Sequence, residues 1–170
     1  MGNWCNVGVK EVRMYQISTR LLERQPTLVM RAKLRVDKMP EFMGHAYGGV
    51  AEYVERHRLE YAGMPFAIHR LLDEVTHEFE VEAGFPISED PGDVPGDSDV
   101  EVSSLPGGNA AVVTHTGPYD QMGPAYDAIA TWLADNGHDP EGLAWEVYHS
   151  DPVAEPDPST WKTEIIQPYR

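Results

Sequence analysis

Glu146 is the residue of this 170-residue chain with the clearest potential for chemistry, because it is a carboxylate inside a short apolar run. No lysine or arginine stands within ten residues of it on either side. Burying such a group costs several kcal/mol and raises its pKa by about 3 units, unless a cation or hydrogen-bond donors reach it. A cationic ligand would be such a partner. Because strands alternate faces, the alternative is that Glu146 faces water while Trp145 and Val147 face the core.

Aromatic side chains stand near Glu146 in the elements that we expect around it. Tyr148 falls on the same strand face as Glu146. Trp161 begins a neighbouring strand, and Tyr126 lies on the apolar stripe of a helix. Contact of a cation with one ring contributes about 0.5–2 kcal/mol, so several rings around one carboxylate would hold a lipophilic cation. The alternative for each ring is a place in the core. The remaining candidate ligand-binding residues are Phe66, His69, Met43 and Met122.

An enzyme is the alternative to a binding protein at the same residues. A desolvated Glu146 with a raised pKa would protonate a reactive electrophile or activate water, while Tyr126 or Trp161 holds the substrate. Other chemistries have little support, because the motifs G-x-S-x-G, His-x-x-x-His and Cys-x-x-Cys do not occur in the sequence. We expect no metal ion and no cofactor, and we interpret the single cysteine, Cys5, as a bystander.

The composition disfavours nucleic acid and the membrane as partners. The formal net charge is -15 at pH 7, whereas affinity for nucleic acid depends on clustered lysine and arginine. No window has the run of about 18 apolar residues that a spanning helix needs, and residues 1–10 lack the layout of a secretory signal. We therefore expect a soluble, cytoplasmic protein, with a protein partner left open.

The sequence repeats itself at an offset of 79 residues. The run Met-Gly-His-Ala-Tyr at residues 43–47 recurs as Met-Gly-Pro-Ala-Tyr at residues 122–126. In both copies the apolar residues fall at i, i+3, i+4, i+7 and i+11, the stripe of an amphipathic helix. At the same offset two strand-like runs coincide, residues 64–69 and 143–148, and there Glu146 takes the place of Ala67. Since the fold accepts either residue at this position, the difference points to function.

Further strand-like runs complete the order strand, helix, strand, strand in each copy. They are residues 27–36 and 75–81 in the first copy and residues 110–116 and 161–167 in the second. Neither copy buries an apolar sheet face alone, so we expect the two to pack side by side with pseudo-twofold symmetry. The expected fold class is α+β, with an antiparallel sheet and two main helices around a central ligand cleft. We expect one domain over residues 1–170, made of repeat 1 (about 10–87), a linker without regular structure (about 88–108) and repeat 2 (about 109–170).

These motifs, in this order, resemble the GyrI-like small-molecule-binding family, also known as the effector-binding domain of AraC-type and multidrug-sensing transcription regulators. The resemblance covers about residues 10–170 and is carried mainly by the second half. The motifs are Thr116-Gly117-Pro118-Tyr119, Met122-Gly123 with Tyr126, Trp132-Leu133 with Asn136-Gly137, Trp145-Glu146-Val147-Tyr148 with Asp151-Pro152, Trp161-x-Thr163-Glu164-Ile165, Asp73-Glu74-Val75 and residues 80–86.

The resemblance implies a duplicated fold and a cleft in which a central acidic residue meets lipophilic, often cationic compounds between aromatic rings. Glu146 falls at the acidic position, and Tyr148, Tyr126 and Trp161 resemble the aromatic wall. Regulators of this type carry a helix-turn-helix module ahead of the domain, whereas here the first strand begins soon after Met1, so we expect a stand-alone member. Such members are taken to sequester toxic compounds, to modulate a partner such as DNA gyrase, or to hydrolyse strained cyclopropane-bearing compounds. We expect binding or sequestration ahead of the other two.

Overall fold

The computed structural model describes residues 14–93 and 98–170. Cys5 and the first residues of repeat 1 therefore lie outside the described residues. The helices are α1 (Met39–Arg56) and α2 (Gly123–Asp135), with short 3-10 turns η1 (Val36–Lys38), η2 (Tyr119–Gln121) and η3 (Pro158–Thr160). The strands are β1 (Ser18–Leu22), β2 (Gln25–Arg35), β3 (Phe66–Asp73), β4 (Glu78–Pro86), β5 (Glu101–Leu105), β6 (Gly108–Thr116), β7 (Trp145–Tyr148) and β8 (Lys162–Pro168).

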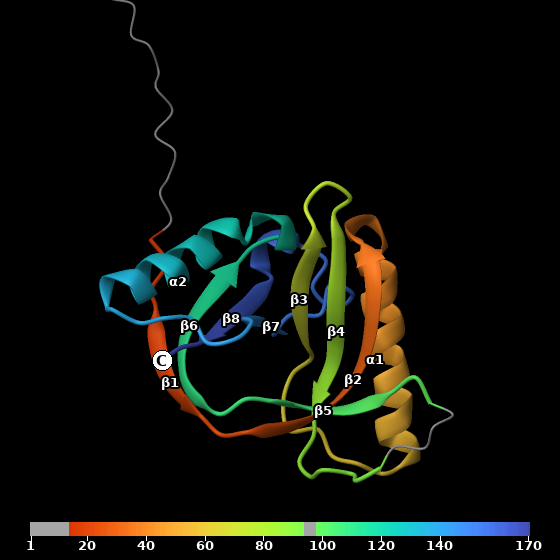
Figure 1. The fold of residues 1–170 in the computed structure, drawn as a ribbon. Helices are drawn as coiled ribbons and strands as arrows, with labels where there is room; N and C mark the ends of the chain where they lie inside the picture. Colours follow the sequence, from red (N-terminus) through yellow and green to blue (C-terminus); the bar gives the residue numbers. More distant parts are fainter. Residues whose placement is uncertain (1–13, 94–97) are drawn as a thin grey trace, which may run out of the picture.

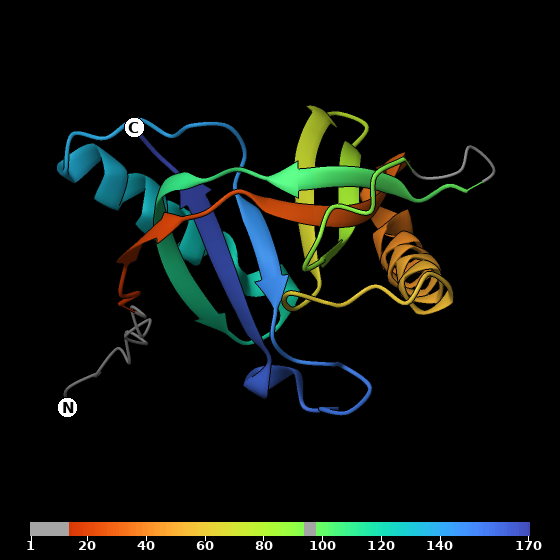
Figure 2. The ribbon, with the colours of Figure 1, turned by 90° about the horizontal axis from the view of Figure 1, so that it is seen from below.

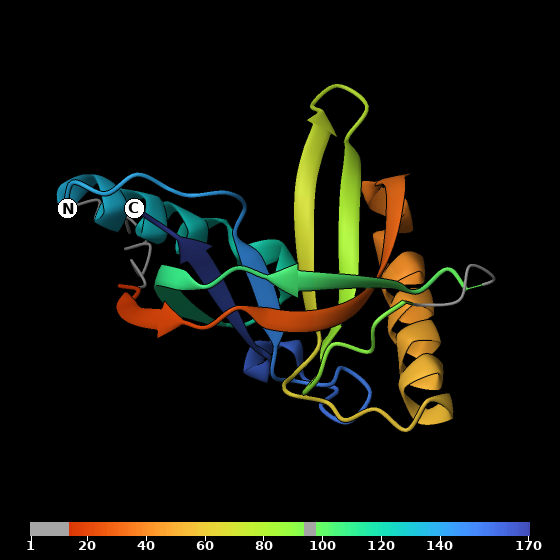
Figure 3. The same cartoon turned by 60° about the horizontal axis from the view of Figure 1, so that its bottom comes forward.

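The strands form one antiparallel sheet in the order β1-β6-β8-β7-β3-β4-β2-β5. The two halves meet at β7 and β3, and each half runs outward in the same relative order, which is the pseudo-twofold arrangement that the repeat predicts. The junction is short, since β3 and β7 pair only at Phe66↔Val147 and Ala67↔Glu146. Figure 3 shows the longer β3–β4 hairpin projecting beyond this junction. The predicted α+β fold with an antiparallel sheet and two main helices is confirmed.

Each helix covers its own half of the sheet, and both lie on the face that carries Ala67 (Figure 1). The apolar stripe of α1 packs against Leu28 and Ala67, and that of α2 packs against Val113 and Ile165. A third cluster, which includes Phe66 and Trp145, fills the opposite face near the junction. Among the described residues, no helix is long and apolar enough to cross a membrane. The buried helix residues are Ala46, Val50, Tyr53 and Val54 in α1 and Ala125, Ile129 and Leu133 in α2.

The outermost strands are exchanged between the halves. Strand β1, which leads into β2, pairs with β6 of the second half, and β5, which leads into β6, pairs with β2 of the first half. Figure 2 shows the two connections running side by side across the molecule. The registers match, because Leu22 pairs with Gly108 while Leu105 pairs with Gln25. The segment 88–108 thus contains a strand, contrary to our expectation, because Leu105 is buried against the sheet.

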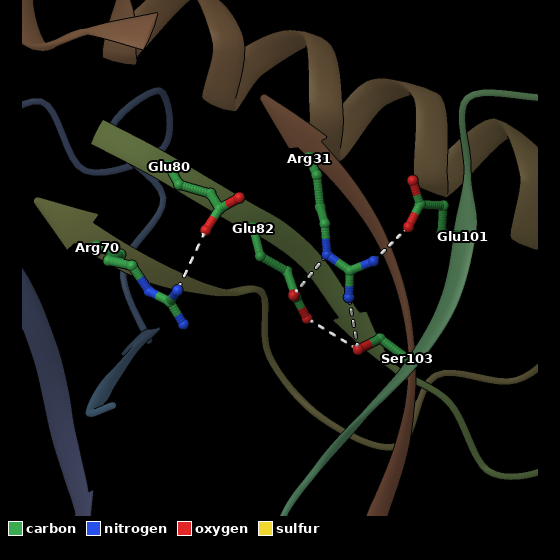
Figure 4. Close-up of polar contacts among 6 residues, drawn as sticks. All are labelled: Arg31, Arg70, Glu80, Glu82, Glu101 and Ser103. Atoms are coloured by element: carbon green, nitrogen blue, oxygen red, sulfur yellow. Dashed lines mark hydrogen bonds and ion pairs between the residues drawn. The ribbon is translucent and has the colours of Figure 1, made fainter. Parts of the chain in front are cut away.

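Arginine–glutamate contacts hold both exchanged strands to their new neighbours. In the first half, the guanidinium of Arg31 on β2 lies 2.9 Å from Glu82 on β4 and also pairs with Glu101 on β5 (Figure 4). In the second half, Arg20 on β1 reaches across β6 and pairs with Glu164 on β8. Each contact spans three adjacent strands, so each ties an exchanged strand to the half that it joins.

The last strand of repeat 1 begins later than the pattern predicts. The expected strand over residues 75–81 starts in a turn, because the Asp73 carboxylate accepts hydrogen bonds from the backbone N–H groups of Val75 at 2.7 Å and Thr76 at 3.0 Å. His77 then has a φ of 53°, in the left-handed region, which reverses the chain. Strand β4 therefore covers Glu78–Pro86.

Candidate functional site

Glu146 lies at the centre of the sheet, where the two repeats meet. It pairs directly with Ala67, its counterpart in the repeat, so the pseudo-twofold axis passes between these two residues. On its other side Glu146 pairs with Ile165, whose side chain lies in the core under α2. The Glu146 side chain is therefore on the helix-covered face and is only 12% exposed. The alternative interpretation of the strand pattern, in which Glu146 faces water, is therefore wrong.

Three donors from three elements converge on the Glu146 carboxylate. The Tyr126 hydroxyl on α2 donates to Oε1 at 2.5 Å, and the Tyr148 hydroxyl on β7 donates to Oε2 at 2.6 Å. The Nε2 atom of His69, on β3, lies 3.4 Å from Oε2 and 3.4 Å from the Tyr148 hydroxyl. Of the residues predicted from sequence, Glu146, Tyr126, Tyr148 and His69 are thus brought together.

These donors determine the charge of Glu146. Burial pushes the pKa of the carboxyl upward, but His69 and the hydroxyls of Tyr126 and Tyr148 stabilise the anion, and the pKa ends below its ordinary value. The rise in pKa that we expected for an unpartnered carboxylate does not occur. Burial and the neighbouring Glu146 charge raise the pKa of both tyrosines, so they remain neutral donors. The site therefore holds a carboxylate anion at neutral pH.

Aromatic rings surround this anion on one side. The ring of Tyr119 stacks on Trp161 with centroids 4.8 Å apart and meets Tyr148 edge to face at 5.5 Å. Tyr119 and Tyr126 keep 39% and 36% of their surface exposed, so the rings reach from solvent to the carboxylate. Tyr119 was not among the predicted site residues, although it belongs to the Thr-Gly-Pro-Tyr run that precedes α2.

A pair of symmetry-related tyrosines shows how far the two halves diverge. Tyr47 on α1 corresponds to Tyr126 on α2, 79 residues later. Its hydroxyl donates to the backbone carbonyl of Phe66 at 3.0 Å instead of to a carboxylate. Burial, followed by the charge of Glu146, raises the pKa of Tyr47. The second half therefore uses its tyrosine, Tyr126, to bind the Glu146 carboxylate, whereas the first half uses Tyr47 to bind the backbone of β3.

Three predicted residues lie in the core instead. Phe66 is fully buried on the opposite face, because it precedes Ala67 and successive side chains of a strand point to opposite faces. Met122, which precedes α2, is buried in the core between α2 and the sheet. Met43, on α1, packs at the edge of the core between α1 and the sheet. The structure does not bring the Phe66 side chain to Glu146.

A cavity of about 390 Å³ lies on the face opposite Glu146, between Ile68, Arg70 and Trp145. Glu146 does not line it, so a cleft at the carboxylate stays a prediction. In residues 14–93 and 98–170, no group of three or more His, Cys, Asp or Glu side chains is placed to hold a metal ion.

Solved structures with this fold include a protein bound to DNA. The chain superposes on EcmrR in an EcmrR–DNA complex with a TM-score of 0.78 and 18% identity, covering 95% of this chain and 59% of EcmrR. It superposes on the isolated EcmrR C-terminal domain with a TM-score of 0.77 and 18% identity, covering 92% of this chain and 98% of the domain. This chain thus spans about three fifths of the length of EcmrR and superposes on the C-terminal domain of that protein.

Two other neighbours are similar over nearly their whole length. A hydrolase from Listeria innocua has a TM-score of 0.64 and 11% identity, with 91% of this chain and 92% of the hydrolase covered. SAV2435, in a structure bound to tetraphenylphosphonium, has a TM-score of 0.58 and 10% identity, with 92% of this chain and 94% of SAV2435 covered. At identities this low, the superpositions show a common fold and nothing more.

Sequence comparison agrees with the fold. None of the curated protein sequences matches the chain. The model of the GyrI-like small molecule binding domain matches residues 22–170, and the chain therefore belongs to the GyrI-like family.

Proposed function

We propose that this protein binds small lipophilic cations, with the Glu146 carboxylate as the anionic anchor and the rings of Tyr119, Tyr126, Tyr148 and Trp161 as the wall. The observation that carries the proposal is the state of Glu146. It is desolvated and ionised, the imidazole of His69 lies 3.4 Å from it, and no lysine or arginine among the described residues pairs with it. Hydroxyl donors stabilise the anion without neutralising it, so a negative charge remains for a ligand.

The wall supports a cation over a neutral compound. The faces of aromatic rings attract cations by about 0.5–2 kcal/mol each, and more when water is displaced. Tyr119, Trp161 and Tyr148 form one continuous ring cluster next to the anion. A flat or bulky cation would gain ring contacts and a charge partner together, and SAV2435, a neighbour with the same fold, is bound to such a cation in its structure.

Two ions of the same shape and opposite charge test the proposal. Tetraphenylphosphonium and tetraphenylborate are to be titrated calorimetrically into the wild type, Glu146→Gln and Glu80→Gln. Glu80 lines the cavity on the opposite face, so its substitution removes one negative charge without touching the site. We expect the wild type and Glu80→Gln to prefer the cation, and Glu146→Gln to lose about tenfold or more in affinity for it.

Other results would count against the proposal. Equal binding of both ions by the wild type would mean that ring contacts alone hold them. An equal loss in Glu80→Gln and Glu146→Gln would assign the preference to overall charge. No heat with either ion would remove the small-cation proposal and direct the search to a protein partner.

A hydrolase is the second candidate function, favoured by the Listeria innocua neighbour of the same fold. Because the pKa of Glu146 is lowered, the carboxylate would act as a base that activates water, with Tyr126 at 2.5 Å as the adjacent donor. A compound with a strained cyclopropane ring is the test substrate. Turnover by the wild type that is lost in both Glu146→Gln and Tyr126→Phe would establish this activity.

A further inference from the structure

His115 is a buried imidazole that the proposed site does not use directly. It lies on β6, is 1% exposed, and is one of four buried polar residues among those that the structure describes. Both ring nitrogens have partners. The Nε2 atom lies 3.0 Å from the backbone carbonyl of Pro118, and Nδ1 lies 2.9 Å from the Tyr15 hydroxyl.

The chemistry of the two partners sets the direction of these bonds. A carbonyl oxygen only accepts, so Nε2–H donates to Pro118. In the neutral ring Nδ1 then accepts from the Tyr15 hydroxyl, and Tyr15 thereby selects the tautomer that can hold Pro118. Tyr15 belongs to the segment ahead of β1, and it packs at the edge of the core under α2. His115 therefore links that segment to the loop after β6.

This loop carries part of the aromatic wall. Pro118 precedes η2, which begins with Tyr119, and Tyr119 stacks on Trp161 and meets Tyr148, a direct donor to Glu146. The backbone N–H of Gly117 donates to the carbonyl of Trp161 at 2.8 Å, which fastens the loop to the other wall residue. The His115 bond thus fixes the backbone on which Tyr119 stands.

The repeat shows that the fold does not need this arrangement. At an offset of 83 residues, η2 corresponds to η1, and the positions of His115 and Tyr119 hold Ala32 and Val36. Arg35 and Pro118, which precede the two turns, have the same extended backbone, with ψ of 154° and 152°. The turn forms in both halves, but only the half with the aromatic wall braces it with a buried histidine.

We propose that His115 is a positioning residue for the Glu146 site, and that Tyr15 sets its orientation, so that the wall responds to the segment ahead of β1. This rests on the proposed function for its ligand readout. A change that draws Tyr15 away leaves Nδ1 without its donor and frees the ring to adopt the tautomer that cannot donate to Pro118. The loop and Tyr119 would then loosen, and affinity for the ligand would fall.

The test uses the full chain with four substitutions. His115→Leu removes the donor to Pro118, His115→Gln keeps a donor, Tyr15→Phe removes only the hydroxyl, and Thr27→Val is the control. Thr27 is fully buried in the other half, and its hydroxyl has no hydrogen-bond partner in the described structure. Tetraphenylphosphonium affinity is measured by calorimetry, and the exchange of the Gly117 amide by NMR.

We expect His115→Leu to lower the affinity for tetraphenylphosphonium about tenfold and Tyr15→Phe to lower it by a smaller factor. The affinities of His115→Gln and Thr27→Val should be close to that of the wild type. Exchange at Gly117 should rise in His115→Leu and Tyr15→Phe by more than exchange at Val81 in the other half. Such a local change distinguishes positioning from a general loss of stability.

Unchanged affinity and unchanged Gly117 exchange in both His115→Leu and Tyr15→Phe would overturn the inference. If His115→Leu does not fold, Tyr15→Phe decides alone, since it keeps the imidazole. If the wild type does not bind tetraphenylphosphonium, the proposed function fails, while Gly117 exchange still tests the role of His115.

Discussion

Glu146 keeps its charge inside the protein because His69 and two tyrosine hydroxyls replace water around it. Tyr126 and Tyr148 each donate to one carboxylate oxygen, and both are neutral. An arginine in their place would satisfy the same oxygens but would also cancel the charge. Tyrosines thus stabilise the buried anion and still leave its negative charge to attract a ligand.

The lowered pKa of Glu146 has a consequence for stability against acid. The unfolded chain takes up the proton near the ordinary value of 4.5, and the folded protein takes it up only at lower pH. The contribution of the anion to stability is therefore complete above that ordinary value and is lost as pH falls through the folded-state pKa. We expect the free energy of unfolding to fall more steeply between about pH 5 and pH 3 in the wild type than in Glu146→Gln.

Urea denaturation at several pH values measures this difference. Glu80→Gln serves as the charge-matched control, because Glu80 lines the cavity on the face opposite Glu146. Parallel slopes for the wild type and Glu146→Gln would show that the tyrosines and His69 do not stabilise the anion.

At the level of single residues, the sequence predicted the place of Glu146 between the two repeats better than it predicted the surroundings of this residue. Glu146 stood out because it replaced Ala67 in an otherwise apolar repeat, and Tyr148 followed from strand alternation. The same alternation places Phe66 on the opposite face from Ala67, which is where it lies. Tyr119 had no comparable signal, because it corresponds to Val36 in a turn whose direction only the folded chain defines.

Between elements, strand exchange makes each half depend on the other. Strands β1 and β5 lie at the two edges of the sheet, and each is covalently attached to the half that it does not pair with. Among the described residues, one arginine cluster in each half connects the exchanged strand to the third strand from the sheet edge. In the first half this is Arg31 with Glu82 and Glu101. Such exposed pairs contribute little to overall stability, so their effect should be local.

We therefore expect Arg31→Ala to lower the free energy of unfolding by less than about 1 kcal/mol, because the Arg31 side chain is 40% exposed. Amide exchange in β5, however, should rise clearly, because this strand loses the ion pair between Glu101 and Arg31 and keeps, as its tie to β4, the hydrogen bond from Ser103 to Glu82. NMR exchange rates measure both effects. Arg56→Ala is the matched control, since Arg56 pairs with Glu52 within α1. Equal exchange of the β5 amides in both variants would contradict the assigned role of Arg31.

The exchange also explains what the repeat could not predict. Helices and the central strands match at an offset of 79 residues, but Leu22 and Leu105 in the exchanged strands are 83 residues apart. A single offset therefore finds the helices and misses β1 and β5. Pairing between distant strands is set by the packing of the whole sheet, and no local pattern in residues 88–108 expresses it.

For the whole molecule, two negative fields act on any ligand. One field comes from the net charge of the whole chain, -15, and the other comes from the Glu146 anion next to the aromatic rings. Added salt distinguishes the two fields. For exposed charges the screening length falls from about 10 Å at 0.1 M to about 3 Å at 1 M, whereas a desolvated charge in contact with its ligand is screened much less. A preference that survives salt therefore originates at the site.

We expect the wild type to keep its preference for tetraphenylphosphonium over tetraphenylborate when the salt concentration rises from about 0.05 M to about 0.5 M, because Glu146 is only 12% exposed. Glu146→Gln should prefer the cation weakly at low salt, through the overall charge, and lose that preference at high salt. Calorimetric titrations of both ions at the two salt concentrations give the four dissociation constants for each protein. If the preference of the wild type disappears with salt as that of Glu146→Gln does, the acidic exterior attracts the cation and Glu146 is not its anchor.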